Sequence, residues 1–194
     1  MPVIKGHSVN EFGENHNMRF QLKEGTQQAH ERLDKALIRY DLTTLPGLRA
    51  YLSVHFLARI HIQKILTGYE NLRDDKEKLF SLRADFEGLN VRPPSWREAP
   101  EIGNYHPLGL IYVMAGSSLG SNLLFKQWSK AMDINVLSVN NFMTSAKDNQ
   151  LWRNFLVHIS NTSFSEAETK SIVAAANHCF SVFEAADKQV SEEF

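Results

Sequence analysis

Residues 112–125 read YVMAGSSLGSNLLF and lie within a longer stretch, Ile102–Phe125, that contains no Asp, Glu, Lys or Arg. An uncharged stretch of this length predicts a buried helix. At its centre two glycines, Gly116 and Gly120, stand four residues apart among serines. Glycine inside a helix costs about 1 kcal/mol relative to alanine. The two glycines therefore indicate either close helix–helix packing or a flat ligand that lies against the backbone.

The composition is that of an ordinary globular chain. It has 194 residues, of which 43% are hydrophobic and 22% charged, and this length favours one domain. The formal net charge of -1 gives no general affinity for nucleic acid or acidic lipid. We expect a cytoplasmic protein without membrane insertion, because neither a signal peptide nor a continuous transmembrane stretch is visible. The single cysteine, Cys179, excludes an internal disulfide framework and a Cys-based zinc cluster.

The hydrophobic periodicity is helical over nearly the whole chain, and strand patterns are scarce. A first helix carries an apolar stripe from Leu22 to Tyr40, and a polar tail is expected over residues 1–17. Further helices are expected over 46–66, 76–89, 107–132, 138–147, 149–160 and 165–190, the last behind a capping box. The sequence therefore predicts one all-α domain of six to eight helices over residues 18–194.

His30 stands at the border of the apolar stripe of the first helix. The stripe centres on Leu33, and His30 lies roughly 60° from that centre, where a side chain can reach a cleft. Lys23 lies two turns earlier on the same flank, about 10 Å away along the axis. A neutral imidazole can bind iron, and a cation at this distance suits an anionic, metal-centred ligand. The chain has eight histidines, so this helix alone leaves an ordinary surface role open.

Residues 22–34, LKEGTQQAHERLD, resemble the start of the heme oxygenases, in which a proximal histidine binds the heme iron. The resemblance implies that His30 is this ligand and that Lys23 faces a heme propionate. Thr26 belongs to the matching run and is taken with the heme-binding residues. Asp34 occupies the position of an acidic residue that supports the histidine. The family usually has Glu there, so the shorter Asp34 is expected to reach the imidazole through a water.

The stretch YVMAGSSLGS resembles the distal-helix motif of bacterial heme oxygenases, Tyr-Val-x-Glu-Gly-Ser-x-Leu-Gly-Gly. In that family this helix passes over the heme face opposite the proximal histidine, and its glycines let the backbone approach. The resemblance implies that Tyr112 contacts heme and that Gly116, Ser117 and Gly120 shape the reacting side.

The same motif departs from the family pattern where the family carries acids. Ala115 stands where the family usually has Glu, and Ser117 stands where animal relatives have Asp. The second terminal glycine is Ser121. The distal helix therefore lacks a carboxylate beside Gly116 to organise water, which bears on turnover more than on heme binding.

A third segment, QLWRN at 150–154, resembles the part of the family whose arginine pairs with a heme propionate. The resemblance implies this role for Arg153, and arginine suits a carboxylate because it forms bidentate hydrogen bonds. The three segments occur in family order. Together they imply a heme-oxygenase-like helical bundle with heme between the proximal and distal helices.

The implied reaction uses heme as both cofactor and substrate. Heme oxygenases consume dioxygen and electrons and produce biliverdin, carbon monoxide and ferrous iron. Electrons are expected from a separate ferredoxin or reductase, because the chain has no GxGxxG fingerprint.

Two alternatives remain open from the sequence. One is a heme-binding carrier or sensor of the same fold with weak or no turnover. The other is a non-heme enzyme of similar architecture. A thiaminase-like enzyme would have only Cys179 as its nucleophile, and a di-iron protein would need Glu-x-x-His pairs that the chain lacks.

Overall fold

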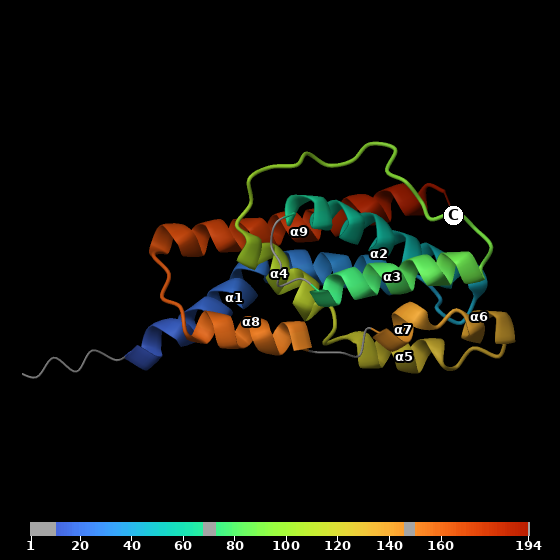
Figure 1. Ribbon diagram of the computed structural model, residues 1–194, viewed down its shortest axis with the longest axis horizontal. Coiled ribbons are helices and arrows are strands. Elements are labelled where there is room, and N and C mark those ends of the chain that lie inside the picture. The colour runs from blue at the N-terminus through green and yellow to red at the C-terminus, as the bar shows by residue number, and fades with distance from the viewer. Residues whose placement is uncertain (1–10, 68–72, 146–149, 194) are drawn as a thin grey trace, which may run out of the picture.

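The computed structural model describes residues 11–67, 73–145 and 150–193, and these residues form helices and connectors without a β-strand (Figure 1). The helices are α1 (Glu11–Leu37), α2 (Leu45–Ile65), α3 (Arg73–Gly88), α4 (Pro107–Gly116), α5 (Ser121–Trp128), α6 (Ile134–Ser138), α7 (Asn141–Ser145), α8 (Gln150–Ser160) and α9 (Glu166–Ser191). The all-α prediction is confirmed. None of the described helices combines the length and apolar character needed to cross a bilayer.

The expected helix boundaries agree with the structure in most places. Thr44 caps α2, because its hydroxyl accepts a hydrogen bond from the backbone N–H of Gly47, and Pro46 lies in the first turn as predicted. Helix α1 begins at Glu11, inside the segment 1–17 that the sequence indicated as a tail, while residues 1–10 lie outside the described residues. In place of the helix expected over 138–147 the structure has the two short helices α6 and α7, and residues 146–149, which include the end of that expected helix and the start of the next, lie outside the described residues.

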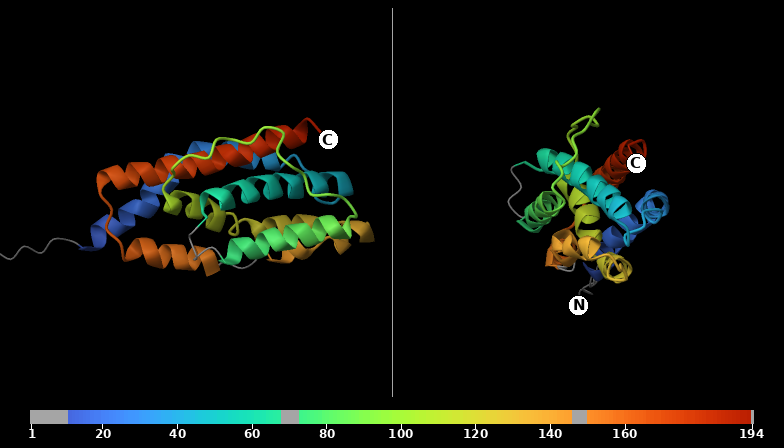
Figure 2. Two further views of the ribbon diagram at one scale, coloured as in Figure 1. Left: turned by 45° about the horizontal axis from the view of Figure 1, so that its top comes forward. Right: turned by 90° about the vertical axis from the view of Figure 1, so that its right-hand side faces the viewer.

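Helix α9 packs against α1, α2 and α4 along one side of the bundle (Figure 2). Its buried face extends from Ile172 to Val190. The predicted capping box is confirmed at its start. Ser165 accepts from the N–H of Glu168, whose carboxylate accepts from the N–H of Ser165. Helix α8 packs on α1 and α4, so these three helices and α9 surround one end of the molecule.

The helix expected over 107–132 is not continuous, which corrects the sequence prediction. It ends as α4 at Gly116 and resumes as α5 at Ser121, with a turn between them. Within this turn the hydroxyls of Ser117 and Ser118 donate to the carbonyl oxygens of Met114 and Ala115 at 2.7 and 2.6 Å. Serine hydroxyls that bond to nearby backbone compete with helix hydrogen bonds, and the glycines at 116 and 120 add low helix propensity.

A long connector, residues 89–106, joins α3 to α4 and runs along the outside of the bundle (Figure 1). Trp96 fastens it by donating from its indole nitrogen to the carbonyl oxygen of Leu57 at 3.0 Å. The side chain of Gln189 in α9 donates to the carbonyl oxygen of Ser95 and accepts from the N–H of Arg97, both at 3.0 Å. The connector therefore lies between the helices expected over 76–89 and 107–132, and it is anchored on α2 and α9.

Candidate functional site

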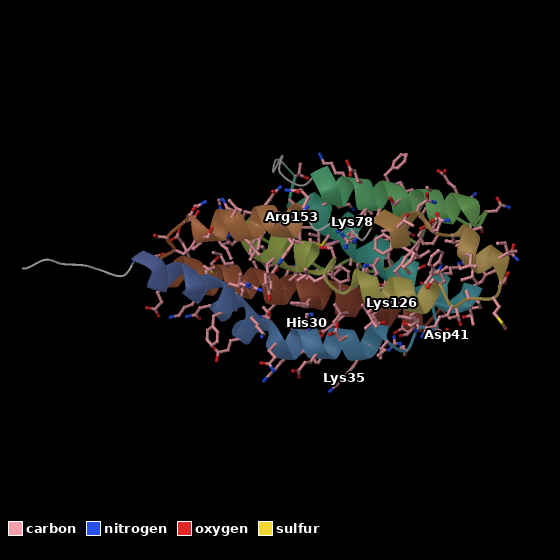
Figure 3. All side chains as sticks on the ribbon, turned by 90° about the horizontal axis from the view of Figure 1, so that it is seen from below. His30, Lys35, Asp41, Lys78, Lys126 and Arg153 are labelled. Carbon is pink, nitrogen blue, oxygen red and sulfur yellow. The ribbon has the colours of Figure 1, made fainter. Side chains whose placement is uncertain are left out.

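His30 lies on the side of α1 that is turned toward α9 and α5 (Figure 3). Its side chain is 60% exposed, and its Nδ1 atom lies 3.2 Å from Oδ2 of Asp34, one turn later. The edge of the ring contacts Phe180 of α9, with ring centroids 5.7 Å apart. A proton on Nδ1 therefore donates to the carboxylate, which leaves the lone pair of Nε2 for a metal. The direct contact corrects the expectation that Asp34 needs a bridging water.

Lys23 and Thr26 of α1 lie in different surroundings. Lys23 is exposed, as a side chain that meets a propionate from solvent would be. Thr26 is 2% exposed, and its hydroxyl donates to the carbonyl oxygen of Leu22 at 2.6 Å. Thr26 is thus packed inside the bundle with its hydroxyl engaged, and the structure gives it a role in α1 rather than a free polar group for a ligand.

The space beside each glycine of this stretch shows which of them serves close helix packing. At Gly109, earlier in α4, a Cβ atom would overlap the carbonyl oxygen of Ile172, so Gly109 is the residue that allows α4 to approach α9. At Gly116 a Cβ atom would make only an ordinary contact, 3.8 Å from the ring of Trp152. At Gly120 it would meet nothing within 4 Å. Close helix packing therefore explains Gly109, but neither Gly116 nor Gly120.

Two apolar side chains are exposed next to Gly120, the glycine with no atom near its Cβ position. Leu119 is 51% exposed and Leu123 is 73% exposed. Exposed apolar groups beside open backbone are typical of a surface that receives an apolar ligand. Leu119 belongs to the distal-helix motif, but neither leucine was predicted as a site residue, although their four-residue spacing within the uncharged stretch was the available signal.

Tyr112 and Arg153 lie at the contact of α4 with α8. The ring of Tyr112 is partly buried against Trp152 and Phe155, with centroids 5.9 and 5.8 Å apart. Arg153 is exposed on α8, and its Nη2 atom donates to the side-chain oxygen of Gln150 at 2.8 Å (Figure 3). In this view Arg153 and His30 lie at separate places, so their joint contact with one ligand stays a prediction.

Ser117 points away from the exposed leucines, toward α2. Its Oγ atom accepts a hydrogen bond from Nη2 of Arg59 at 2.8 Å, and its own proton goes to Met114. Arg59 is 1% exposed. Next to this pair His55 and Lys78, both buried, line a cavity of about 10 Å³. This buried polar cluster was not predicted from the sequence. Its signal was the pair of polar residues His55 and Arg59, four residues apart in an otherwise apolar helix.

Burial lowers the pKa of His55 well below its usual range, and the positive charges of Arg59 and Lys78 lower it further. The unfolded chain therefore binds a proton near pH 6.5 that the folded chain does not, so stability is full above this pH and falls below it. We expect His55→Leu to reduce the loss of stability from pH 6.5 to 5 by up to about 1.4 kcal/mol per pH unit. Urea unfolding at several pH values measures this slope. Part of this slope should remain in the variant, because burial also lowers the pKa values of His61 and His178.

A separate pocket of about 850 Å³ lies between α4, α8 and the segment 161–164. Its walls are mostly apolar, and His106 and His158 contribute polar groups. The volume lies in the range of small-molecule sites. Neither His30 nor the turn at 116–120 lines this pocket, so it is a separate location with room for a small molecule.

Comparison with known proteins assigns the family. The sequence model of the heme oxygenases matches residues 61–188, which is more than half of the chain. The chain belongs to the heme oxygenase family. The fold is similar to that of the heme oxygenase of Neisseria meningitidis, known from crystal structures with bound NO and CO, with a TM-score of 0.73 and 16% sequence identity over 89% of this chain and 91% of that chain. No curated protein sequence matches the chain significantly.

The site residues of this chain fit heme. The range matched by the family includes the turn 116–120 and Arg153, whereas α1 with His30 lies outside it. His30 offers a neutral nitrogen donor oriented by Asp34, and Gly120 and Leu123 offer open, apolar surface. This donor set suits an apolar macrocycle that carries iron.

The non-heme alternatives find no support in the structure. Cys179 is 0% exposed and lies against α4, so a substrate cannot reach its sulfur as a nucleophile. Among the described side chains, no group of three or more His, Cys, Asp or Glu residues is placed to hold a metal ion. The thiaminase-like and di-iron interpretations are therefore set aside for this part of the chain.

Proposed function

We propose that the protein is an enzyme that binds heme through His30 and degrades it with dioxygen and external electrons to biliverdin, carbon monoxide and ferrous iron. The observation that supports this most is the exposed imidazole of His30, held at Nδ1 by Asp34 at 3.2 Å, on a helix that packs on α9 beside α4. When bound, heme supplies the iron and its reactivity toward dioxygen.

Each residue of the chain has a limited task in this proposal. Asp34 fixes the tautomer and the direction of the His30 ring, so that Nε2 would be free to hold the iron. Gly120 would leave room for the macrocycle, because it adds no side chain to the space beside it. Lys23 and Arg153 would hold the propionates and so set the rotation of the macrocycle about the iron. An external ferredoxin or reductase supplies the electrons.

The first experiment adds one equivalent of hemin to the protein and then ascorbate or a ferredoxin system in air. We expect a Soret band that decays within the incubation while biliverdin absorbance grows, because the protein positions the macrocycle for its own oxidation. Anaerobic addition of the same reductant is the control, and it should leave the heme spectrum intact. Loss of heme without biliverdin, at the same rate as free hemin, would contradict the proposal.

Heme binding without turnover is the second candidate function. It is favoured by the turn at 116–120, which carries no carboxylate and in which the Ser117 hydroxyl is engaged by Arg59 and Met114. A Soret band that depends on His30 but persists under reductant and oxygen identifies this outcome.

A further inference from the structure

The pocket of about 850 Å³ at the contact of α4 and α8 is built mostly from apolar side chains. Helix α4 contributes Leu108 and Ile111, and α8 contributes Leu151 and Phe155. The segment that leads into α9 contributes Phe164. Three parts of the chain therefore surround a volume within the range of about 300–1,000 Å³ that is typical of small-molecule sites. Such walls favour a ligand whose surface is mostly apolar.

His106 supplies this pocket with a polar group whose tautomer is fixed. It caps α4, because its Nδ1 atom accepts a hydrogen bond from the backbone N–H of Leu108 at 3.3 Å. Burial lowers the pKa of His106, although the carboxylate of Glu168 opposes this shift, so the ring is neutral near pH 7. The proton of the neutral ring is then on Nε2, the ring nitrogen that the helix cap does not use, and this atom can donate to a ligand.

Two side chains on the α8 side of the pocket add hydrogen-bonding capacity. Asn154 accepts through Oδ1 from Nε2 of Gln150 at 2.7 Å, so its Nδ2 group remains a donor. Thr162 gives its proton to the carbonyl oxygen of His158 at 2.9 Å, so its oxygen can still accept. A ligand with a carbonyl group therefore has donors from both α4 and α8 available in an otherwise apolar pocket.

The charges around the pocket favour a neutral ligand. None of the described residues that line it is Lys, Arg, Asp or Glu. A charged ligand would lose hydration here without gaining a counter-charge. Glu168, in the first turn of α9, is close enough to His106 to raise its pKa against the effect of burial. The negative charge of this carboxylate disfavours an anion further.

We propose that this pocket is a second ligand site, which binds an uncharged, mostly apolar small molecule with a hydrogen-bond acceptor, such as an aromatic ketone, and orients it through Nε2 of His106. The site is separate from the one proposed for heme, because neither His30 nor the turn 116–120 lines it. Heme itself does not suit this pocket, since its two propionates are anions. The inference therefore goes beyond the proposed function and does not depend on it.

The test uses Prodan, a neutral naphthyl ketone whose emission shifts to the blue in apolar surroundings, and two competitors of one shape, acetonaphthone and naphthoate. We expect acetonaphthone to displace Prodan at a concentration roughly tenfold lower than naphthoate does, because only naphthoate carries a charge. His106→Ser keeps a hydroxyl that can cap α4 but removes the Nε2 donor. It should weaken Prodan binding about fivefold, as expected for the loss of one hydrogen bond.

A matched pair of variants locates the bound Prodan. Val157→Trp places a larger side chain in the pocket, and the protein should remain folded because Val157 is 60% exposed. We expect this variant to bind Prodan more than roughly tenfold more weakly, since the new ring occupies the space of the ligand. The control is Leu123→Trp, which makes the same kind of change at a residue that is 73% exposed beside the turn proposed for heme. It should leave Prodan affinity unchanged.

Three results would overturn the inference. The first is equal Prodan affinity in Val157→Trp and the unaltered protein. The second is a loss of affinity in Leu123→Trp alone, which would place Prodan on the heme surface. The third is displacement by naphthoate at the same concentration as by acetonaphthone. His30→Ala separates the two proposals, because it should remove hemin binding and leave Prodan affinity unchanged.

Discussion

Replacement of His30 by alanine is expected to remove the Soret band of the hemin complex and to weaken hemin binding more than roughly a hundredfold. Loss of a residue that only supports a metal ligand by a hydrogen bond costs about 10- to 100-fold in metal affinity. Loss of the ligand itself should therefore weaken hemin binding more than this. Because His30 is 60% exposed, the substitution creates no cavity, and the protein should remain folded. Optical titration of hemin, with circular dichroism as a check on folding, measures both effects.

Two further variants sharpen this test. Asp34→Asn removes the charge that holds Nδ1 and should weaken hemin binding by about tenfold, less than His30→Ala does. His158→Ala changes another exposed histidine, which lines the 850 Å³ pocket between α4 and α8. It should leave hemin binding unchanged. If His158→Ala abolishes binding while His30→Ala preserves it, the ligand occupies that pocket and the proximal role of His30 is wrong.

The sequence predicted features that depend on a single helix. The four-residue spacing of His30 and Asp34 places both on one helix face, and the structure shows the resulting contact of 3.2 Å. The capping box of Ser165 and Glu168 is likewise a local pattern, and it forms as expected. The role of His30 toward heme stays a prediction, because it depends on a ligand and on α1, which the family match does not cover.

Features that depend on contacts between helices were not predicted. The hydrogen bond from Arg59 to Ser117 joins residues 58 positions apart, and nothing in either segment indicates its partner. The break between α4 and α5 was not predicted, because the hydrophobic periodicity of this uncharged stretch indicates one continuous helix. Its cause is a sum of weak local effects, two glycines and two serine hydroxyls, that together outweigh continued helix hydrogen bonding at this place.

Gly109→Ala and Gly120→Ala are expected to separate the two uses of glycine in the uncharged stretch. At Gly109 the new methyl group would overlap backbone atoms of Ile172 and Ala176 in α9, which cannot move aside as a flexible side chain does. We expect a loss of about 3 kcal/mol in the free energy of unfolding, equivalent to roughly 6–12 °C in Tm for a chain of this size. Thermal and urea unfolding of the ligand-free protein measure this loss.

At Gly120 the methyl group meets no atom within 4 Å, and the backbone is already in the right-handed helical region, with φ -80° and ψ -11°. Stability should therefore be unchanged or higher by about 0.5–1 kcal/mol, because alanine restricts the unfolded chain. Hemin affinity should nevertheless fall, since the methyl group enters the space that the ligand is proposed to fill. Gly120→Ala with undiminished hemin binding would place the macrocycle elsewhere, and with lowered stability it would return Gly120 to a packing role like that of Gly109.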